Sequence, residues 1–390
     1  MIRITDKSLC CGCTACVNAC PVQCIVMRRD REGFDYPVAN PDICINCGKC
    51  ETVCPVLNPR SESAPLAAFA ARSEADMEGC SSGGLFPMLA GKFIQEGGVV
   101  YGAAFMEDMT VGHVDVTDVD GLERLKGSKY VQSDPYAVFE EVRDLLKDGG
   151  HVLFAGTPCQ IAGLHDFLGE RKEGLITVDI ACHGVPAPGL WEKYVSALER
   201  RFGGRLRDVS FRDSSKSWRH YGVKFEIQTE DGLYSRHVSN MSDPYMALFL
   251  QDMTLRPSCY SCPARKGRSG SDITLADLWN VSEAAPEFDD DRGTSLVLVN
   301  TAVGQRLFES LVKDGLRVLA VDKETAVKRN SGFAADVKIP EKREEFFKGI
   351  HSSKDIIGYM NSYVVCKSMV RIIYEKVHTF MSGIKKKIIR

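Results

Sequence analysis

The chain has 390 residues, of which 44% are hydrophobic and 26% are charged, and its formal net charge is −3. Such a composition is ordinary for a globular protein of two or three domains. The small net charge excludes a general attraction to nucleic acid or to an anionic membrane. The sequence shows no apolar leader and no run of about 18 apolar residues, so we expect a cytoplasmic protein.

Cysteine is the exceptional residue type, with sixteen in the chain. A reducing compartment disfavours stable disulfides. Metal ligation or redox chemistry is therefore the expected use of these thiols.

Two dense cysteine runs open the chain, "CCGCTACVNACP" at 10–21 and "CINCGKCETVCP" at 44–55. Both contain the spacing C-x2-C-x2-C-x3-C-P, which resembles that of two-cluster bacterial ferredoxins. In such ferredoxins the fourth cysteine of each run ligates the other cluster. One [4Fe–4S] cluster is thus expected on Cys10, Cys13, Cys16 and Cys54, and a second on Cys44, Cys47, Cys50 and Cys20.

Structural zinc is the alternative for these thiols. Zinc sites usually join two C-x2-C pairs across a dozen or more residues, with four ligands for one ion, and the duplicated dense runs fit that pattern poorly. Cys11 and Cys24 lie outside the spacing and are expected to be small buried or loop residues. We predict a ferredoxin domain over 1–57, followed by a Pro- and Ser-rich linker over 58–68.

The rest of the chain alternates between helical and strand patterns. Helices are predicted over 85–96, 133–148, 159–169 and 189–204, with Ser133 or Asp134 as the N-cap of the second. Strands are predicted over 99–105, 151–157, 174–181 and 295–300, and 206–237 is strand-rich. This alternation predicts a layered α/β domain with a partly parallel sheet, α+β overall once the ferredoxin domain is included.

The tail, residues 346–390, is predicted to be helical and basic. Apolar residues recur there near a 3.6-residue period and the chain ends "GIKKKIIR". A helix of this kind can make weak contact with a membrane surface. Docking on the protein, with the lysines in solvent, is the favoured alternative.

Four further cysteines are far apart in the sequence: Cys159, Cys182, Cys259 and Cys262. The first two follow predicted buried strands, where the loops of an α/β sheet collect ligands. The last two form a C-x2-C pair. One cluster or one metal ion could use all four thiols.

The phrases around these cysteines carry a family resemblance. "SSGGLF" (81–86), "KGSKYVQS" (126–133), "GTPCQ" (156–160), "ACHG" (181–184) and "CYSC…SDITLADLW" (259–279) occur in this order. Over about 66–345 the chain resembles the family of coenzyme F-420 hydrogenase/dehydrogenase beta subunits. The resemblance divides this part into an N-terminal α/β domain, 69–185, and a C-terminal domain with the cysteine pair, 186–345.

The resemblance implies an iron–sulfur flavoprotein that binds FAD. It assigns a third [4Fe–4S] cluster to Cys159, Cys182, Cys259 and Cys262, with zinc or simple packing as the alternative. The residues that match the family's FAD site are Ser81, Ser82, Gly83, Gly84, Lys126, Ser128, Lys129, Tyr130, Thr157 and Asp277. Glycines and hydroxyls ahead of a helix would let backbone N–H groups approach a pyrophosphate.

Two further residue predictions concern charge and protons. His183, beside Cys182, is the preferred proton donor among eight histidines. Arg265, Lys266 and Arg268 are expected to form a basic patch that meets an anionic substrate or faces solvent.

The predicted function is an electron relay, because a flavin converts one-electron into hydride chemistry. An external ferredoxin or other redox protein would exchange electrons with the N-terminal clusters. An organic substrate, a deazaflavin or a polysaccharide precursor, would react at the flavin. Two alternatives stay open: an electron-transfer subunit of a hydrogenase or formate dehydrogenase complex, and a cluster protein whose flavin site is vestigial.

Overall fold

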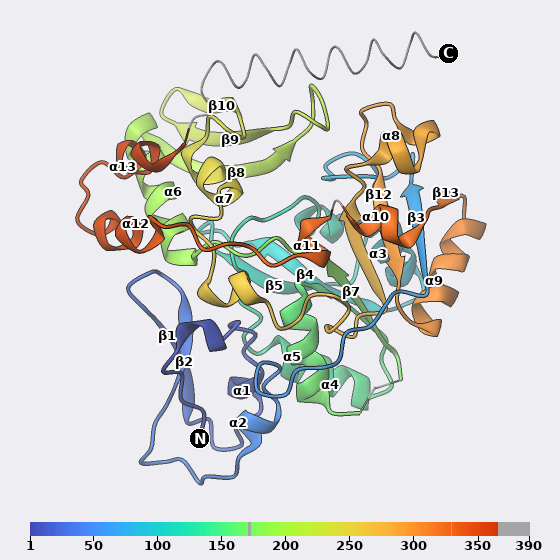
Figure 1. Ribbon diagram of the computed structural model, residues 1–390, viewed down its shortest axis with the longest axis horizontal. Coiled ribbons are helices and arrows are strands. Elements are labelled where there is room, and N and C mark those ends of the chain that lie inside the picture. Colours follow the sequence, from blue (N-terminus) through green and yellow to red (C-terminus); the bar gives the residue numbers. More distant parts are fainter. Residues whose placement is uncertain (171–172, 329, 366–390) are drawn as a thin grey trace.

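The ferredoxin module occupies one end of the computed structural model, which describes residues 1–170, 173–328 and 330–365. In Figure 1 it is the blue region that carries the N-terminus. It contains an antiparallel hairpin and two single-turn helices that each present a cysteine. Its elements are β1 (Ile25–Arg29), β2 (Asp35–Ala39), α1 (Ala15–Asn18) and α2 (Lys49–Thr52).

An eight-stranded mixed sheet forms the main body. In spatial order its strands are β13 (Arg317–Ala320), β3 (Ala67–Arg72), β12 (Ser295–Val299), β11 (Ile273–Asp277), β7 (Leu175–Ile180), β6 (Val152–Gly156), β4 (Val99–Phe105) and β5 (Val111–Val116). The four strands from β4 through β6 and β7 to β11 are parallel, and the outer strands are antiparallel. The predicted α/β class with a partly parallel sheet is confirmed.

Helices cover both faces of this sheet because its central strands are apolar on both sides. One face packs against α3 (Leu85–Gln95) and α9 (Ala302–Lys313). The other face packs against α4 (Val138–Lys147) and α5 (Pro158–Leu168), and near β3 against α8 (Val281–Ala284) and α10 (Lys323–Lys328). Alternate residues of β6 divide between the faces: Leu153 joins the first core, and Val152 and Phe154 join the second.

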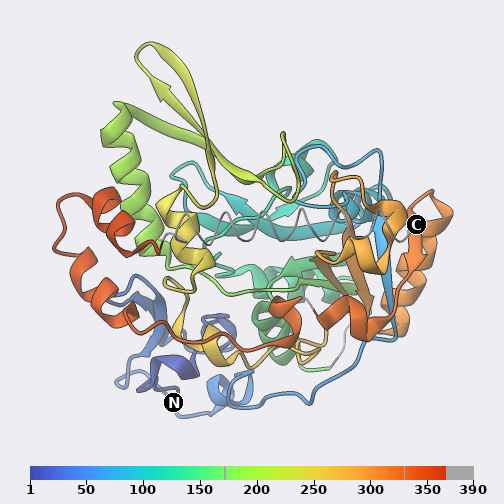
Figure 2. The same cartoon turned by 45° about the horizontal axis from the view of Figure 1, so that its top comes forward.

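A second, three-stranded antiparallel sheet is formed by the part of the sequence that connects β7 to β11 of the main sheet. It consists of β8 (Gly204–Asp213), β9 (Gly222–Thr229) and β10 (Gly232–Ser239), and the β9–β10 hairpin projects from the body in Figure 2. Its core includes α6 (Pro188–Phe202), α7 (Pro244–Leu250), α12 (Arg343–Ile350) and α13 (Ile356–Tyr363). Residue 185 is the boundary between the two domains that the resemblance implied, 69–185 and 186–345. The main sheet contains strands from before and after this boundary.

The start of α4 differs from the prediction. The helix begins at Val138 with Ala137 as its N-cap, so the predicted caps, Ser133 and Asp134, were wrong. Asp134 lies in extended backbone that bonds to Val111 and His113 of β5. Its carboxylate accepts a hydrogen bond from the Tyr136 N–H at 2.9 Å. This local bond engages the side-chain oxygen that would otherwise cap the helix.

The ferredoxin module is packed tightly against the main body. A Cβ on Gly163 of α5 would lie 2.9 Å from the Cys13 Sγ, so only glycine permits this approach of the cysteine loop. The Gly189 N–H, in α6, donates to the Gly33 carbonyl at 3.0 Å. The linker is also held, since Arg60 forms an ion pair with Asp166 of α5.

In the part of the chain that the structure describes, no helix is both long and apolar enough to cross a membrane. The predicted membrane-surface contact falls on the last 25 residues, 366–390, which lie outside the described residues.

Candidate functional site

The eight cysteines of the two runs line two separate cavities. We call Cys10, Cys13, Cys16 and Cys54 the inner set and Cys20, Cys44, Cys47 and Cys50 the outer set. Each set joins three cysteines of one run to the fourth of the other. Apolar residues complete both walls, for example Ile4 and Met27 at the inner set and Val22 and Ile25 at the outer set.

The geometry of these sets fits a polynuclear cluster better than a single ion. Among the described residues no three His, Cys, Asp or Glu side chains are arranged around one ion position. Four thiolates around a cubane stand farther apart than around zinc, since the cluster occupies their centre. The outer sulfurs also receive backbone donors: the N–H groups of Ile2 and Cys24 lie 3.3 Å from the sulfurs of Cys50 and Cys20.

The four scattered cysteines form a third set in the main body. Cys159 lies in the first turn of α5 and Cys182 follows β7. Cys259 lies within the 3-10 turn η3 (Pro257–Ser261), and Cys262 is its C-cap. Burial and the thiols of Cys259, Cys159 and Cys262 raise the pKa of Cys182. Burial and the Cys262 thiol raise the pKa of Cys259 to about 12. Loading of a metal cluster here would therefore expel protons.

An unpaired donor beside this third set fits a negatively charged cluster. The buried Arg265 donates to the carbonyls of His183 and Ala335, while its Nε has no partner among the described residues. Its charge opposes the burial that raises the pKa of Cys182 and Cys262. A buried guanidinium with a free N–H is stabilised when an anion faces it.

Cys11 joins the inner set to the third set. Contact with the Cys13 thiol raises the pKa of Cys11, and contact with the Cys11 thiol raises the pKa of Cys159. Cys11 is buried, as its prediction as a packing residue implies, but its position between two cysteine sets was not foreseen. Only the docking of α5 against the ferredoxin loop decides this position.

A second polar site gathers around Ser81. The hydroxyls of Ser81 and Ser128 lie 2.8 Å apart, and the Ser128 N–H donates to the Ser81 Oγ at 2.9 Å. The Ser81 carbonyl accepts from Arg212 Nη2 and Trp218 Nε1. Arg212 also pairs with Asp277 at 2.8 Å. The predicted flavin residues Ser81, Ser128 and Asp277 thus share one network.

This second site contains buried polar atoms without partners among the described residues, namely Ser82 Oγ and Arg212 Nε. Trp279 stacks on Trp218 at 5.0 Å and is 41% exposed. An orphaned hydroxyl, an orphaned guanidinium N–H and an exposed indole fit a polar ligand with a planar ring. Arg212 and Trp218 were missed at the sequence level, although the aromatic and basic loop "SWRHYG" was an available signal.

The lysines of "KGSKY" border the same site. Lys126 pairs with Glu123 at 2.5 Å. Lys129 donates to the carbonyls of Arg124 and Lys126, and burial lowers its pKa to about 7. The nearby Asp208 charge acts against this lowering, and an anion bound beside Lys129 would likewise favour its protonated form.

Packing accounts for the small size of two predicted flavin residues. A Cβ on Gly83 would lie 2.6 Å from the Ala71 carbonyl, and the Gly83 N–H already donates to Ser295 Oγ. A Cβ on Gly84 would lie 2.7 Å from the Asp76 carbonyl. These glycines allow the loop to lie against β3. Ligand binding by this loop would therefore depend more on the neighbouring side chains than on the glycines themselves.

Thr157 and His183 lie at the third cysteine set. Thr157 caps α5, and its hydroxyl is 3.3 Å from the Cys159 sulfur. His183 Nε2 lies 2.5 Å from Asp252 Oδ1, and its ring contacts Phe249 at 5.4 Å. Phe249 in turn contacts Tyr130 of the flavin motif at 4.7 Å. An aromatic path thus connects the third set with the second site.

The predicted basic patch at 265–268 was wrong for Arg265, which is buried and faces the third set. Lys266 and Arg268 instead pair with Glu62 of the linker. Tertiary packing separates these three neighbours because they sit in a tight turn.

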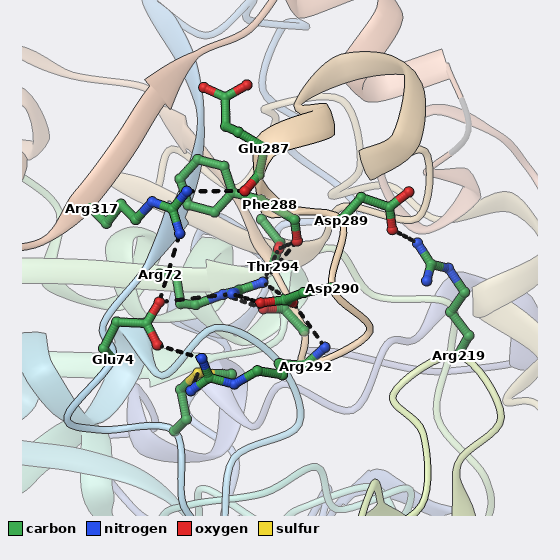
Figure 3. Close-up of polar contacts among 12 residues, drawn as sticks. Arg72, Glu74, Arg219, Glu287, Phe288, Asp289, Asp290, Arg292, Thr294 and Arg317 are labelled. Atoms are coloured by element: carbon green, nitrogen blue, oxygen red, sulfur yellow. Dashed lines mark hydrogen bonds and ion pairs between the residues drawn. The ribbon is translucent and has the colours of Figure 1, made fainter.

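Figure 3 shows how the loop from Glu287 to Thr294 is held. Arg72 of β3 donates to Asp290 at 2.6 Å, to the Gly293 carbonyl at 2.8 Å and to Thr294 at 3.0 Å. Gly293 packs against Ser82 and Trp218. This arginine network fixes one wall of the second site.

Comparison with known proteins gives two family matches. Residues 149–324 match the family described as the C terminus of the coenzyme F420 hydrogenase/dehydrogenase beta subunit, and residues 9–58 match the 4Fe-4S dicluster domain. A curated relative, the F subunit of the F(420)H(2) dehydrogenase of Methanosarcina mazei, is 23% identical over 81% of this chain and 86% of its own length.

Ferredoxins match the N-terminal module alone. Ferredoxin 7Fe of Hydrogenibacillus schlegelii is 52% identical over 11% of this chain and 47% of its own length. Ferredoxin-1 of Caulobacter vibrioides is 45% identical over 14% of this chain and 42% of its own length. The chain therefore spans less than half of either ferredoxin.

A solved structure of the F420-reducing [NiFe] hydrogenase complex from Methanosarcina barkeri also matches. It is 15% identical, with a TM-score of 0.43, over 77% of this chain and 92% of the matched chain.

Proposed function

We propose that this chain, an oxidoreductase related to the coenzyme F420 hydrogenase/dehydrogenase beta subunits with a 4Fe-4S dicluster domain, relays electrons between its clusters and a bound FAD. The FAD would exchange a hydride with an organic substrate. A deazaflavin is the proposed substrate class, since the name of the curated relative includes F(420)H(2).

The adjacency of the inner and third cysteine sets is the observation that carries this proposal. Cys11 lies between Cys13 and Cys159, and Gly163 brings α5 against the same loop. Redox centres that are separated only by a few packed residues can exchange electrons directly, without a mobile carrier. A ferredoxin module that only supplied another protein would have no need of this buried junction.

The second site is the proposed place of the flavin. Ser81, Ser82 and Ser128 would donate hydrogen bonds to it, and Lys126 and Lys129 would neutralise its phosphates. Arg212, held by Asp277, would offer its free Nε. A bound flavin supplies the exchange between one-electron and hydride chemistry.

His183 is proposed as a residue that holds a proton close to the third set. Asp252 orients its imidazole at 2.5 Å. Phe249 stands between this ring and Tyr130, so the residue does not face the second site directly. Its expected role is to move a proton with the electron rather than to donate directly to substrate.

Anaerobic purification of the full chain tests the proposal. We expect about twelve irons per chain, from three clusters of four, together with one FAD. A Cys182→Ser variant should lose about four irons and keep the signals of the other two clusters. Eight irons in the wild type, or the absence of flavin, would contradict the third cluster or the FAD, respectively.

An electron-transfer subunit of a larger complex is the second candidate. The outer set favours it, because Cys47 is exposed and is flanked by Ile45, which is 61% exposed. An apolar rim at an exposed redox centre suits a docked protein partner. Slow substrate turnover by the isolated chain, restored by a partner protein, would select this candidate.

A further inference from the structure

Five arginines are buried in the described part of the chain, and one of them differs from the rest. Four have a carboxylate within 4 Å: Arg72 with Asp290, Arg212 with Asp277, Arg265 with Asp336 and Arg343 with Glu32. Figure 3 shows the first of these pairs. Arg256, only 1% exposed, has no such partner among residues 1–170, 173–328 and 330–365.

The Arg256 guanidinium lies at the inner cysteine set. Its Nε donates to the Cys10 carbonyl at 2.7 Å, and its Nη2 lies 3.5 Å from the Cys10 sulfur and 3.0 Å from the Asp35 carbonyl. The charge also lies 4.2 Å from the Tyr36 ring centre. Carbonyls and a ring face bind the cation but do not neutralise it.

The Arg256 backbone belongs to the third cysteine set. Its N–H donates to the Val185 carbonyl, three residues beyond Cys182, at 3.0 Å. Its carbonyl accepts from the Cys259 N–H at 2.8 Å, where the turn that carries Cys259 begins. One residue therefore connects both cysteine segments to the inner set.

Gln132 completes the arrangement. Its Oε1 accepts from Arg256 Nη1 at 3.0 Å, while its Nε2 donates to the Cys11 carbonyl at 3.1 Å. A Cβ on Gly12 would lie 2.9 Å from Arg256 Nη1, so the loop leaves no space for another side chain. The guanidinium is thus fixed in one place.

A buried, unpaired cation is costly unless a negative group faces it. A cubane held by four thiolates carries net negative charge, which increases when it accepts an electron. A cation beside it stabilises the reduced form more than the oxidised form. This stabilisation raises the reduction potential.

We propose that Arg256 is the shared counter-charge of the inner cluster and the third cluster, and that it raises the reduction potential of both. The inference deepens the proposed function and rests on it. An electron that enters at the outer set is then drawn inward. One electron leaves one cluster and enters the next, no bond is formed or broken, and Arg256 keeps its proton.

Potentiometric titration of the full chain, with dithionite as reductant and EPR as readout, tests this role. In Arg256→Gln we expect the reduced-to-oxidised ratio of the inner and third clusters to fall about tenfold or more at the wild-type midpoint, equivalent to about 59 mV for one electron. The outer cluster should keep its midpoint, and Arg256→Lys should restore the others to within about threefold in ratio. Arg343→Gln, another buried arginine at the module boundary, is the matched control and should shift none.

Unchanged inner and third midpoints in iron-replete Arg256→Gln would overturn the proposal. Equal shifts of all three clusters, or an Arg256→Lys shift as large as that of Gln, would also overturn it. If Arg256→Gln fails to retain iron, Gln132→Glu decides, since its carboxylate would neutralise the guanidinium in place: a lowered inner midpoint supports the proposal and an unchanged one overturns it. A wild type with two clusters contradicts the proposed function, whereas the inner-cluster measurement still tests Arg256.

Discussion

The inner and outer cysteine sets have the same cysteine spacing and opposite surroundings. Both use the same spacing, and both reach their short helix through a left-handed residue, Thr14 at φ 65° and Gly48 at φ 76°. Cys10, Cys13 and Cys16 are buried beneath the main body, whereas Cys47 is exposed. The equivalent positions Cys11 and Ile45 are 5% and 61% exposed, respectively.

This difference indicates that the repeated motif supplies the cluster ligands, whereas the surrounding residues determine whether a cluster faces the main body or the protein surface. The inner loop touches α5, Gln132 and Arg256 and so faces the third cysteine set and the proposed relay. The outer loop has an exposed apolar residue, Ile45, which we propose as part of a docking surface for a partner. We therefore expect changes at equivalent positions to have unequal effects.

The largest effect should come from cysteine substitution in the two sets. Cys13→Ala and Cys47→Ala should each remove about four irons or convert one cluster. Because Cys13 is buried against Gly163, its loss should also lower the free energy of unfolding by about 2–4 kcal/mol more. Iron analysis with thermal unfolding checks this, and equal destabilisation would show that the inner loop is not anchored.

A pH titration tests how completely the residues next to the third cysteine set are buried. Burial lowers the pKa of His113 to about 4, and this residue bonds to the Ala155 carbonyl beneath the turn that carries Cys159. The unfolded chain binds a proton below about pH 6.5 and the folded chain does not. Stability is thus complete above pH 6.5 and falls by about 3 kcal/mol as pH decreases to 4.

Acid unfolding of wild type and His113→Gln measures this slope. The variant should lose most of the decline between these pH values. A decline that survives in the variant would assign the acid sensitivity to other titrating groups, such as the remaining seven histidines, instead of His113.

Glycine substitutions give the sharpest matched pair. Gly12→Ala and Gly48→Ala both place Cβ on a left-handed residue, with φ of 72° and 76°. A Cβ on Gly12 would also lie 2.6 Å from Gln132 Nε2, whereas a Cβ on Gly48 would meet no other described residue within 4 Å beyond its chain neighbours. We expect Gly12→Ala to cost about 1–3 kcal/mol more, and equal costs in denaturant unfolding would contradict the tight interface.

The smallest effect on stability should come from the outer rim. Ile45→Lys should leave the unfolding free energy within about 0.5 kcal/mol, because the side chain is exposed. Electron transfer from an external redox protein should slow several-fold, as measured by stopped flow. Val312→Lys, on an exposed position of α9, is the control and should not change the rate.

Much of this protein follows from sequence alone. Cysteine spacing predicted the pairing of runs that the two cavities display, because three thiols in a curled loop have few ways to converge. The alternation of apolar segments predicted the helices at 85–96 and 159–169 within a residue or two, since burial on one face requires that period. Ordered short phrases predicted the family.

The tertiary structure alone decided the rest. No local pattern shows that Cys11 contacts Cys159, or that Arg212 and Trp218 share the Ser81 carbonyl. Nor does any local pattern show that Arg256 is buried without a carboxylate partner in the part of the chain that the structure describes. These residues come from segments that are separated by up to 246 positions. Spacing encodes contacts within a loop, whereas contacts between loops depend on how whole helices and sheets pack, and that packing gives this chain its buried path between cysteine sets.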